Sequence, residues 1–191
     1  MARRIHSQGE ETRQCILTAA SRLFVEKGVD NASLKDIARA AGVSPGTLFY
    51  YYSSKSELIF DVTDQHFDRI THQLLDWARA SQDQTEPSQI FSVVLKTIIA
   101  DEMRGKLHLH LIGEAVSRDA LVRERFFQKY REWQTMIESG IEPFVAGDEQ
   151  RRVSAQMFLA ILDGLVLQAL LGVKDMPLEQ IAERFAASLA D

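Results

Sequence analysis

Apolar residues recur at steps of three and four along most of the chain, which is the spacing of one face of an α-helix. The first such stripe contains Ile16, Ala19, Ala20, Leu23 and Phe24. It predicts a helix from about residue 10 to residue 27. Gly28 follows at once and favours the left-handed backbone that ends helices. The helical spacing continues to the C-terminus, so the sequence predicts an all-α fold.

Two short helices are expected next, each opened by a serine. Ser33 and Asp36 have the spacing of a capping box, and this helix is expected to end at Gly42. Ser44 can cap the following helix, with Pro45 at its first position, where the missing N–H costs nothing. That helix is expected to run to about residue 52. Two short helices joined by so tight a turn have the spacing of a helix-turn-helix.

Six longer segments complete the expected fold. The first is a helix over about 55–80, which a polar loop at 81–88 follows. Five more helices are expected near 88–103, 106–116, 119–139, 149–171 and 177–189. All 4 prolines fall at these boundaries. Residues 107–111 alternate like a strand, but no partner strand is apparent, so we expect helix there too.

The composition excludes several classes of protein. The chain has 191 residues, of which 46% are hydrophobic and 26% charged, so disorder is not expected. Its 1 cysteine excludes an intramolecular disulfide. The longest apolar run, 158–173, is interrupted by Asp163 and Gln168 and is shorter than the roughly 18 residues of a membrane span. No apolar stretch follows the basic N-terminus, so no signal peptide is expected. We therefore expect a cytoplasmic protein without a membrane partner.

The charge is unevenly distributed. The net charge of the whole chain is −5, but residues 1–60 carry a net +2 and the remainder a net −7. A basic N-terminal part on an acidic body is what a DNA-binding head would show, although an enzyme could show it by chance.

The second helix of the helix-turn-helix has the residues that a DNA-reading helix needs. It starts with four small residues: Ser44, Pro45, Gly46 and Thr47. Small side chains let the helix N-terminus approach DNA, and its free amides favour phosphate. Thr47 can touch a base edge, and tyrosine hydroxyls can donate to phosphates. A plain helical bundle is the alternative, but Phe49 and the three tyrosines after it are hard to bury together.

Residues 12–59 closely resemble the DNA-binding domain of the TetR family of transcriptional regulators. The resemblance rests on Phe24 to Gly28, on DIA at 36–38, on AGVS at 41–44, on GTL at 46–48 and on Ser54, Lys55 and Leu58. Three positions depart from the family pattern. Phe49 stands where tyrosine is frequent, Tyr51 where histidine is frequent and Tyr52 where phenylalanine is usual. The loss of a hydroxyl at Phe49 removes one phosphate contact that the family pattern allows.

The resemblance implies a division into a DNA-binding domain at 9–56 and a ligand-binding and dimerisation domain at 57–191. It also implies that Leu48 and Tyr52 pack inwards. Lys55 would hold a phosphate at the start of the long helix. The implied DNA contacts are Ser33, Lys35, Ser44, Pro45, Gly46, Thr47, Tyr50, Tyr51 and Lys55.

The C-terminal part is similar to that of the BetI-like branch of the family, which implies a homodimer. Two helices, about 119–139 and 149–171, would pair with their mates in a four-helix bundle. The second is apolar on several sides, so it needs covering on both faces. A central core helix in a monomer is the alternative reading. The expected interface residues are Met157, Phe158, Ile161, Leu162, Leu165 and Ala169.

A pocket for a small molecule is expected in the same domain, although its apolar residues could be plain core. The expected lining residues are Phe67, Met103, Leu107, His110, Glu114, Phe127, Trp133 and Asp163. No cofactor is expected, because the chain has no P-loop, GxSxG or HExxH motif. No metal site is expected either. His108 and His110 diverge by about 200° on a helix and cannot share one metal.

These observations lead to one main hypothesis and two alternatives. The main one is a dimeric, ligand-responsive repressor of a palindromic double-stranded DNA operator, released by an unknown small-molecule effector. The first alternative is an orphan DNA-binding regulator without a ligand. The second is a helical enzyme with a pocket in the C-terminal domain.

Overall fold

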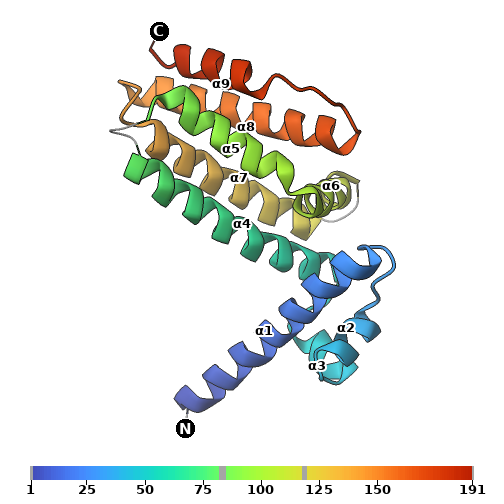
Figure 1. Cartoon of the computed structure of the whole chain (residues 1–191). Helices are drawn as coiled ribbons and strands as arrows, with labels where there is room; N and C mark the ends of the chain where they lie inside the picture. Colours follow the sequence, from blue (N-terminus) through green and yellow to red (C-terminus); the bar gives the residue numbers. More distant parts are fainter. Residues whose placement is uncertain (1, 82–84, 118–119, 191) are drawn as a thin grey trace.

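A computed structural model describes residues 2–81, 85–117 and 120–190, and Figure 1 shows the whole chain. The described residues form α-helices and no strand, which confirms the expected all-α fold. The helices are α1 (Ala2–Lys27), α2 (Leu34–Ala40), α3 (Pro45–Tyr51), α4 (Lys55–Ser81), α5 (Pro87–Ala100), α6 (Glu102–Ser117), α7 (Ala120–Ile141), α8 (Asp148–Leu170) and α9 (Leu178–Ala187).

The expected helices lie close to those observed. The largest difference is at the N-terminus, where α1 begins at Ala2 instead of about residue 10. The alternating segment 107–111 lies inside α6, so the helical interpretation is confirmed. The expected loop at 81–88 falls partly, at 82–84, outside the described residues.

The short helices begin and end as their sequences indicate. Ser33 Oγ accepts from the N–H of Asp36 at 3.1 Å, and Ser44 Oγ accepts from the N–H of Thr47 at 3.0 Å. Between α2 and α3, Gly42 has a φ of +69°, which a residue with a side chain rarely adopts. The N–H of Val43 donates to the carbonyl oxygen of Ala38 at 3.0 Å. These contacts fix the tight turn that joins the two helices.

One apolar core holds the N-terminal helices on the rest of the molecule. We call α1–α3 the head and α4–α9 the body; Figure 1 shows the head at one end of the body helices. The shared core packs Leu23, Phe24 and Ile37 of the head with Leu58 and Ile59 of α4. It continues into the body through α6 and α7. The body residues in it are Phe60, Val62, Leu107, Leu111, Ala115, Val122 and Phe126.

A second core lies in the body and joins α5, α8 and α9 with the end of α7. Phe91, Phe158 and Phe185 form its centre, with ring centroids 4.7–5.2 Å apart. The remaining buried members are Leu95, Ile141, Val145, Leu162, Leu165, Ala182 and Leu189.

Helix α8 contributes Phe158, Leu162 and Leu165 to this core. By length and composition alone it is also apolar enough to cross a membrane. The core helix of a soluble protein meets the same test, and Phe158, Leu162 and Leu165 are buried inside the protomer. Helix α6 approaches the C-terminal part of α8 closely. A Cβ at Gly105 of α6 would lie 3.2 Å from Val166 and 3.3 Å from Leu170 of α8.

Candidate nucleic-acid interface and effector cavity

Helix α3 is anchored by one face and open to solvent on the other. Leu48 is fully buried and Tyr52, just after the helix, is 3% exposed, which confirms that both pack inwards. Ser44, Pro45 and Gly46 are exposed at the start of the helix, and Thr47 is half-buried. Tyr50 is 84% exposed, which leaves its ring and hydroxyl free to meet a partner. The helix therefore presents an N-terminus with small side chains beside an exposed aromatic residue.

The other residues expected at DNA lie around this helix. Ser33 and Lys35 are exposed at the start of α2, where the Ser33 hydroxyl donates to Asp36 Oδ2 at 2.7 Å. The rings of Tyr50 and Tyr51 pack edge to face with centroids 5.2 Å apart. Lys55 Nζ donates to the carbonyl oxygen of Asp30 at 3.3 Å.

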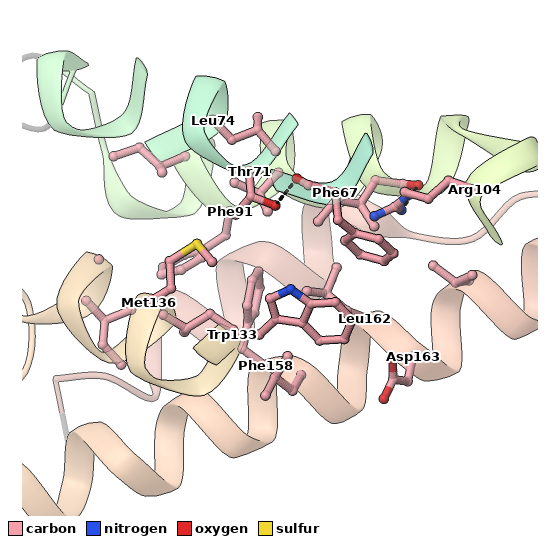
Figure 2. Close-up of a pocket in the computed structure, with 18 of the residues that line it drawn as sticks. Phe67, Thr71, Leu74, Phe91, Arg104, Trp133, Met136, Phe158, Leu162 and Asp163 are labelled. Atoms are coloured by element: carbon pink, nitrogen blue, oxygen red, sulfur yellow. Dashed lines mark hydrogen bonds between the residues drawn. The ribbon is translucent and has the colours of Figure 1, made fainter. Parts of the chain in front are cut away.

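A cavity of about 140 Å³ lies in the body. Helices α4 to α8 all contribute to its wall, as Figure 2 shows for many of the side chains. Its size is similar to the roughly 150 Å³ of an engineered apolar cavity that binds benzene. The lining is Phe67, Thr71, Leu74, Ile90, Phe91, Val94, Ile98, Arg104, Gly105, His108, Trp133, Met136, Ile137, Gly140, Ile141, Phe144, Phe158, Leu159, Leu162, Asp163 and Val166.

The ionisable groups of this lining belong to three residues: Arg104, His108 and Asp163. Arg104 is 3% exposed and His108 7%. The Arg104 guanidinium lies over the Phe67 ring, with Cζ 4.7 Å from the centroid. The Phe67 ring stacks on Trp133 with centroids 4.7 Å apart. Because the rest of the wall is almost wholly apolar, the cavity can distinguish ligands by charge.

Three of the expected pocket residues line this cavity and five do not. Phe67, Trp133 and Asp163 belong to the lining. Leu107 is buried in the shared core, and Met103 packs against it. Those two expectations were wrong because α6 turns that face towards α1, not towards α8.

The other three expected pocket residues, His110, Glu114 and Phe127, also lie outside the cavity wall. His110 turns to the head, where its Nδ1 lies 4.0 Å from Asp30 Oδ1. Phe127 is 56% exposed on the outer side of α7, and Glu114 is absent from the cavity wall. Sequence reasoning missed Arg104 and every lining residue of α5. A buried arginine gives no signal in the sequence, since most arginines are exposed.

Asp61 of α4 forms a polar junction between head and body. Its carboxylate accepts from Arg13 of α1 at 2.5 Å, from Arg125 of α7 at 2.5 Å and from the Tyr52 hydroxyl at 3.0 Å. Arg125 also lies 3.9 Å above the Phe60 ring. Burial opposes ionisation of Asp61, but the hydrogen bonds from Arg125 and Arg13 outweigh it and hold the pKa of this carboxyl below its ordinary value. The sequence analysis did not single out this residue.

The outer face of α8 carries apolar residues that nothing in the protomer covers. Val153, Met157, Leu167 and Leu171 are 43–74% exposed. Ala160 and Gly164 lie between them in sequence and leave room for close approach. We call these six residues the α8 stripe. Of the expected interface residues, Met157 belongs to it, while Ile161 and Ala169 are half-buried.

Three expected interface residues need correcting. Phe158, Leu162 and Leu165 are 3–9% exposed within the protomer and belong to its second core. They are therefore not available to a partner. A helix that is apolar on several sides gives no signal of which side faces inwards.

A helix-turn-helix head joined to a helical body with an apolar cavity defines the class of ligand-responsive DNA-binding regulators. The sequence matches two family profiles. Residues 16–62 match the bacterial regulatory proteins of the tetR family, and residues 84–191 match the C-terminal domain of BetI-type transcriptional repressors. Because the second match spans more than half of the chain, the chain belongs to the TetR family of transcriptional regulators.

Relatives and solved structures agree with this assignment. The regulator AcrR of Shigella flexneri is 26% identical over 200 residues, covering 100% of this chain and 93% of AcrR. TtgR of Pseudomonas putida is 37% identical over 87 residues, 46% of this chain and 40% of TtgR. Among solved structures, FadR of Thermus thermophilus, a repressor in complex with lauroyl-CoA, has a TM-score of 0.70. It is 20% identical and the match covers 93% of this chain and 92% of FadR, so it shows the fold.

Proposed function

We propose that two copies of this chain bind a palindromic operator, each with its α3 in the major groove, and that a small molecule in the cavity weakens this binding. The main support is that two helices of the body, α4 and α6, both line the cavity and pack against the DNA-binding head. Repression is the proposed direction, since BetI-type repressors carry this C-terminal domain. Such a protein would act in the cytoplasm.

Helix α4 links the two functions through one rigid element. Leu58 and Ile59 lie in the core shared with the head, while Phe67 and Leu74 line the cavity. Helix α6 does the same with neighbouring parts of one side. Leu107 and Leu111 pack in the shared core, and Arg104 and His108 line the cavity. A ligand that shifts either helix would therefore move the head.

The effect of a ligand is a population shift between two arrangements of the heads. An operator with half-sites one helical turn apart requires the two α3 helices to be about 34–36 Å apart. A ligand weakens DNA binding only if it binds more tightly to the arrangement that lacks this spacing. The lauroyl-CoA complex of FadR supports a small-molecule effector here. A regulator without any ligand would leave this cavity without a role.

The α8 stripe is the proposed contact with the second copy. In a two-fold dimer the same patch meets itself, so both partners contribute an apolar face with small residues at its centre. On α7, the other helix expected in the interface, Leu121 and Phe127 are 54% and 56% exposed. Two helices from each copy would then form a four-helix bundle, as the sequence predicts. The enzyme alternative has no support, because both family profiles and the relatives described are regulators.

Two substitutions, one in α3 and one at the start of α4, separate phosphate contact from base reading. Lys55→Ala is expected to weaken binding to every DNA sequence alike and to reduce the salt slope of the affinity by about one. Thr47→Ala is expected to relax the choice of base at particular positions instead, by about 1–3 kcal/mol per contact. Fluorescence anisotropy with labelled duplexes at several salt concentrations measures both. Lys96→Ala, on the body, is the matched control.

Each outcome bears on a separate residue. An unchanged salt slope in Lys55→Ala would remove Lys55 from the phosphate contacts. A uniform loss across all sequences in Thr47→Ala would show that Thr47 does not read bases. If neither variant differs from Lys96→Ala, the DNA-reading role of this face of the head is wrong.

A further inference from the structure

We propose that the cavity binds an apolar monocarboxylate, a short alkanoate or arylalkanoate, with its carboxylate group on Arg104. This inference rests on the proposed function only in taking the cavity as the effector site. The observations behind it are the buried and sparsely hydrogen-bonded guanidinium of Arg104, the hydrogen bond that Asp163 already accepts from Tyr130, and the apolar remainder of the wall.

Arg104 is a buried cation with few partners. Among the residues described, its guanidinium donates from Nη2 to the carbonyl oxygen of Ile98, and Nε has no hydrogen-bond partner. The Phe67 ring covers it but provides no acceptor oxygen. Asp101 is the carboxylate that influences it, and one of that residue's oxygens already accepts from the backbone N–H of Arg104 at 3.0 Å. Burial lowers the pKa of Arg104, and the charge of Asp101 offsets this effect only in part.

The carboxylate in the cavity wall has partners already. Asp163 Oδ2 accepts from the Tyr130 hydroxyl at 2.7 Å, and Oδ1 lies 3.7 Å from His108 Nε2. Burial and the charge of Asp163 both raise the pKa of Tyr130, which keeps that hydroxyl as a donor. The cavity thus holds a deeply buried cation with few partners and an anion that is 41% exposed and already accepts one hydrogen bond. A ligand carboxylate would supply the counter-charge that Arg104 lacks inside the cavity.

His108 adds a second unused polar atom at the same end. Its Nδ1 is buried without a partner, and the ring packs between Phe67 and Phe126 with centroids 5.7 and 5.4 Å away. Arg104 and His108 are four residues apart on α6, so they lie on one face of that helix. In the tautomer that carries the proton on Nδ1, His108 would donate to one oxygen of a ligand carboxylate while Arg104 donates to the other.

The other end of the cavity selects an apolar ligand body. Figure 2 shows Leu74 and Met136 at the end away from Arg104, and the lining continues there with Phe91 and Phe158. Volume limits the size of this body. A cavity of about 140 Å³ accommodates a group about the size of a phenyl ring without rearrangement. A second charged group on the ligand would meet only apolar side chains.

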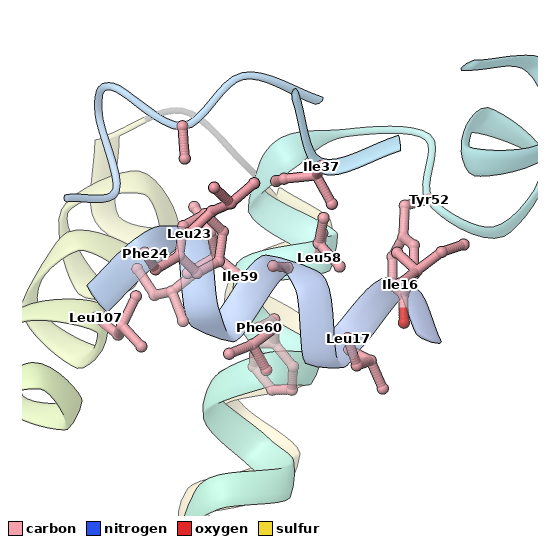
Figure 3. Packing of buried hydrophobic residues seen from close by; sticks show 14 of the residues in the cluster. Ile16, Leu17, Leu23, Phe24, Ile37, Tyr52, Leu58, Ile59, Phe60 and Leu107 are labelled. Atoms are coloured by element: carbon pink, nitrogen blue, oxygen red, sulfur yellow. The ribbon is translucent and has the colours of Figure 1, made fainter. Parts of the chain in front are cut away.

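The position of Arg104 on α6 explains how binding of such a ligand would affect the DNA-binding head. Leu107 follows Arg104 by one turn and packs in the shared core, where Figure 3 shows it beside Phe24 of α1. Any displacement of Arg104 towards a carboxylate would therefore be transmitted directly to α1.

The test compares ligands that differ in their head group. Binding of octanoate, 3-phenylpropionate, 1-octanol and octylammonium to the full-length protein is measured by isothermal titration calorimetry. We expect the carboxylates to bind at least about tenfold more tightly than octanol or octylammonium, because a hydrogen bond to a charged group contributes about 1.5–3 kcal/mol. A preference for octylammonium, or equal affinity for octanoate and octanol, would overturn the proposal.

Variants of Arg104 then locate the carboxylate. Arg104→Gln is expected to lower octanoate affinity to that of octanol and to leave octanol binding unchanged. Lys106→Gln is the matched control, because Lys106 lies on the same helix but is exposed and pairs with Glu102 at 2.5 Å. If Arg104→Gln does not fold, Arg104→Lys keeps the charge without the guanidinium and should bind octanoate more weakly than the wild type. Wild-type affinity for octanoate in either folded variant would contradict the proposal.

Release of operator DNA is measured separately, so the two claims can fail independently. Octanoate binding that depends on Arg104 without any effect on DNA affinity would support the ligand class and contradict the proposed effector role of the cavity. DNA release by octylammonium would support the effector role and contradict the carboxylate.

Discussion

Replacing Leu167 by glutamate will convert the proposed dimer into a monomer and remove most of its operator affinity. Leu167 is 43% exposed in the protomer and lies in the α8 stripe, where the second copy is expected. A two-fold interface would contain the substitution twice, so two unpaired carboxylates would be buried together. Burial of each such ion costs several kcal/mol, so we expect the dissociation constant of the dimer to rise by at least about 100-fold.

Operator affinity should fall together with the stability of the dimer, because a monomer binds only one half-site. Light scattering during size-exclusion chromatography measures the mass across a range of protein concentrations, and anisotropy measures the DNA affinity. Val93→Glu is the control, since Val93 on α5 is 37% exposed and lies outside the stripe. A Leu167→Glu protein that remains dimeric, or a Val93→Glu protein that dissociates, would show that the interface lies elsewhere.

Replacing Asp61 by asparagine will destabilise the protein and loosen the joint between head and body. The substitution keeps the shape of the side chain but leaves Arg13 and Arg125 without their counter-charge. Asp61 is 10% exposed, whereas the two arginine side chains are 39% and 33% exposed, so solvent screens part of the loss. We expect the free energy of unfolding to fall by about 2 kcal/mol, less than the 3–5 kcal/mol for a fully buried pair.

The same variant predicts a pH dependence. Because the pKa of Asp61 is lowered in the folded state, its carboxylate stabilises the fold above the unfolded pKa of about 4. That stability is lost as the pH falls through the folded pKa. The difference between wild type and Asp61→Asn should therefore be full at pH 7 and should shrink below about pH 4.

Urea unfolding at matched protein concentration measures this difference at pH 7 and at pH 3. Asp76→Asn, an exposed carboxylate on the same helix, should change stability by less than about 0.5 kcal/mol. Equal stability of Asp61→Asn and the wild type at pH 7 would remove the junction from the account. A difference that persisted unchanged at pH 3 would assign it to a cause other than the charge.

The head was the most predictable part of the molecule. Capping serines, Gly42 and Pro45 set local backbone geometry through contacts within four residues, so Ser33 and Ser44 cap their helices as expected. The inward packing of Leu48 and Tyr52, which the family resemblance implies, is also observed. The DNA contacts themselves stay predictions, since the structure contains no DNA.

The body shows where sequence patterns carry too little information. Leu165 and Leu167 have the same character and are two residues apart, yet the first is 5% exposed and the second 43%. When both sides of a helix are apolar, its rotation is set by neighbouring helices and not by its own pattern. Arg104 was missed for a related reason: its burial depends on how α6 meets α4 and α8, which no local spacing encodes. Asp61 did carry a weak signal, because it is a charge between the apolar Phe60 and Val62.

Selection of bound DNA from a random pool tests the central claim most directly. The purified protein is allowed to bind, the enriched sequences are read, and the best of them is titrated at several salt concentrations. The account predicts a palindrome with half-sites about one helical turn apart and an affinity that falls log-linearly with salt. No enriched sequence, or one that lacks two-fold symmetry, would contradict a dimer that reads an operator through α3.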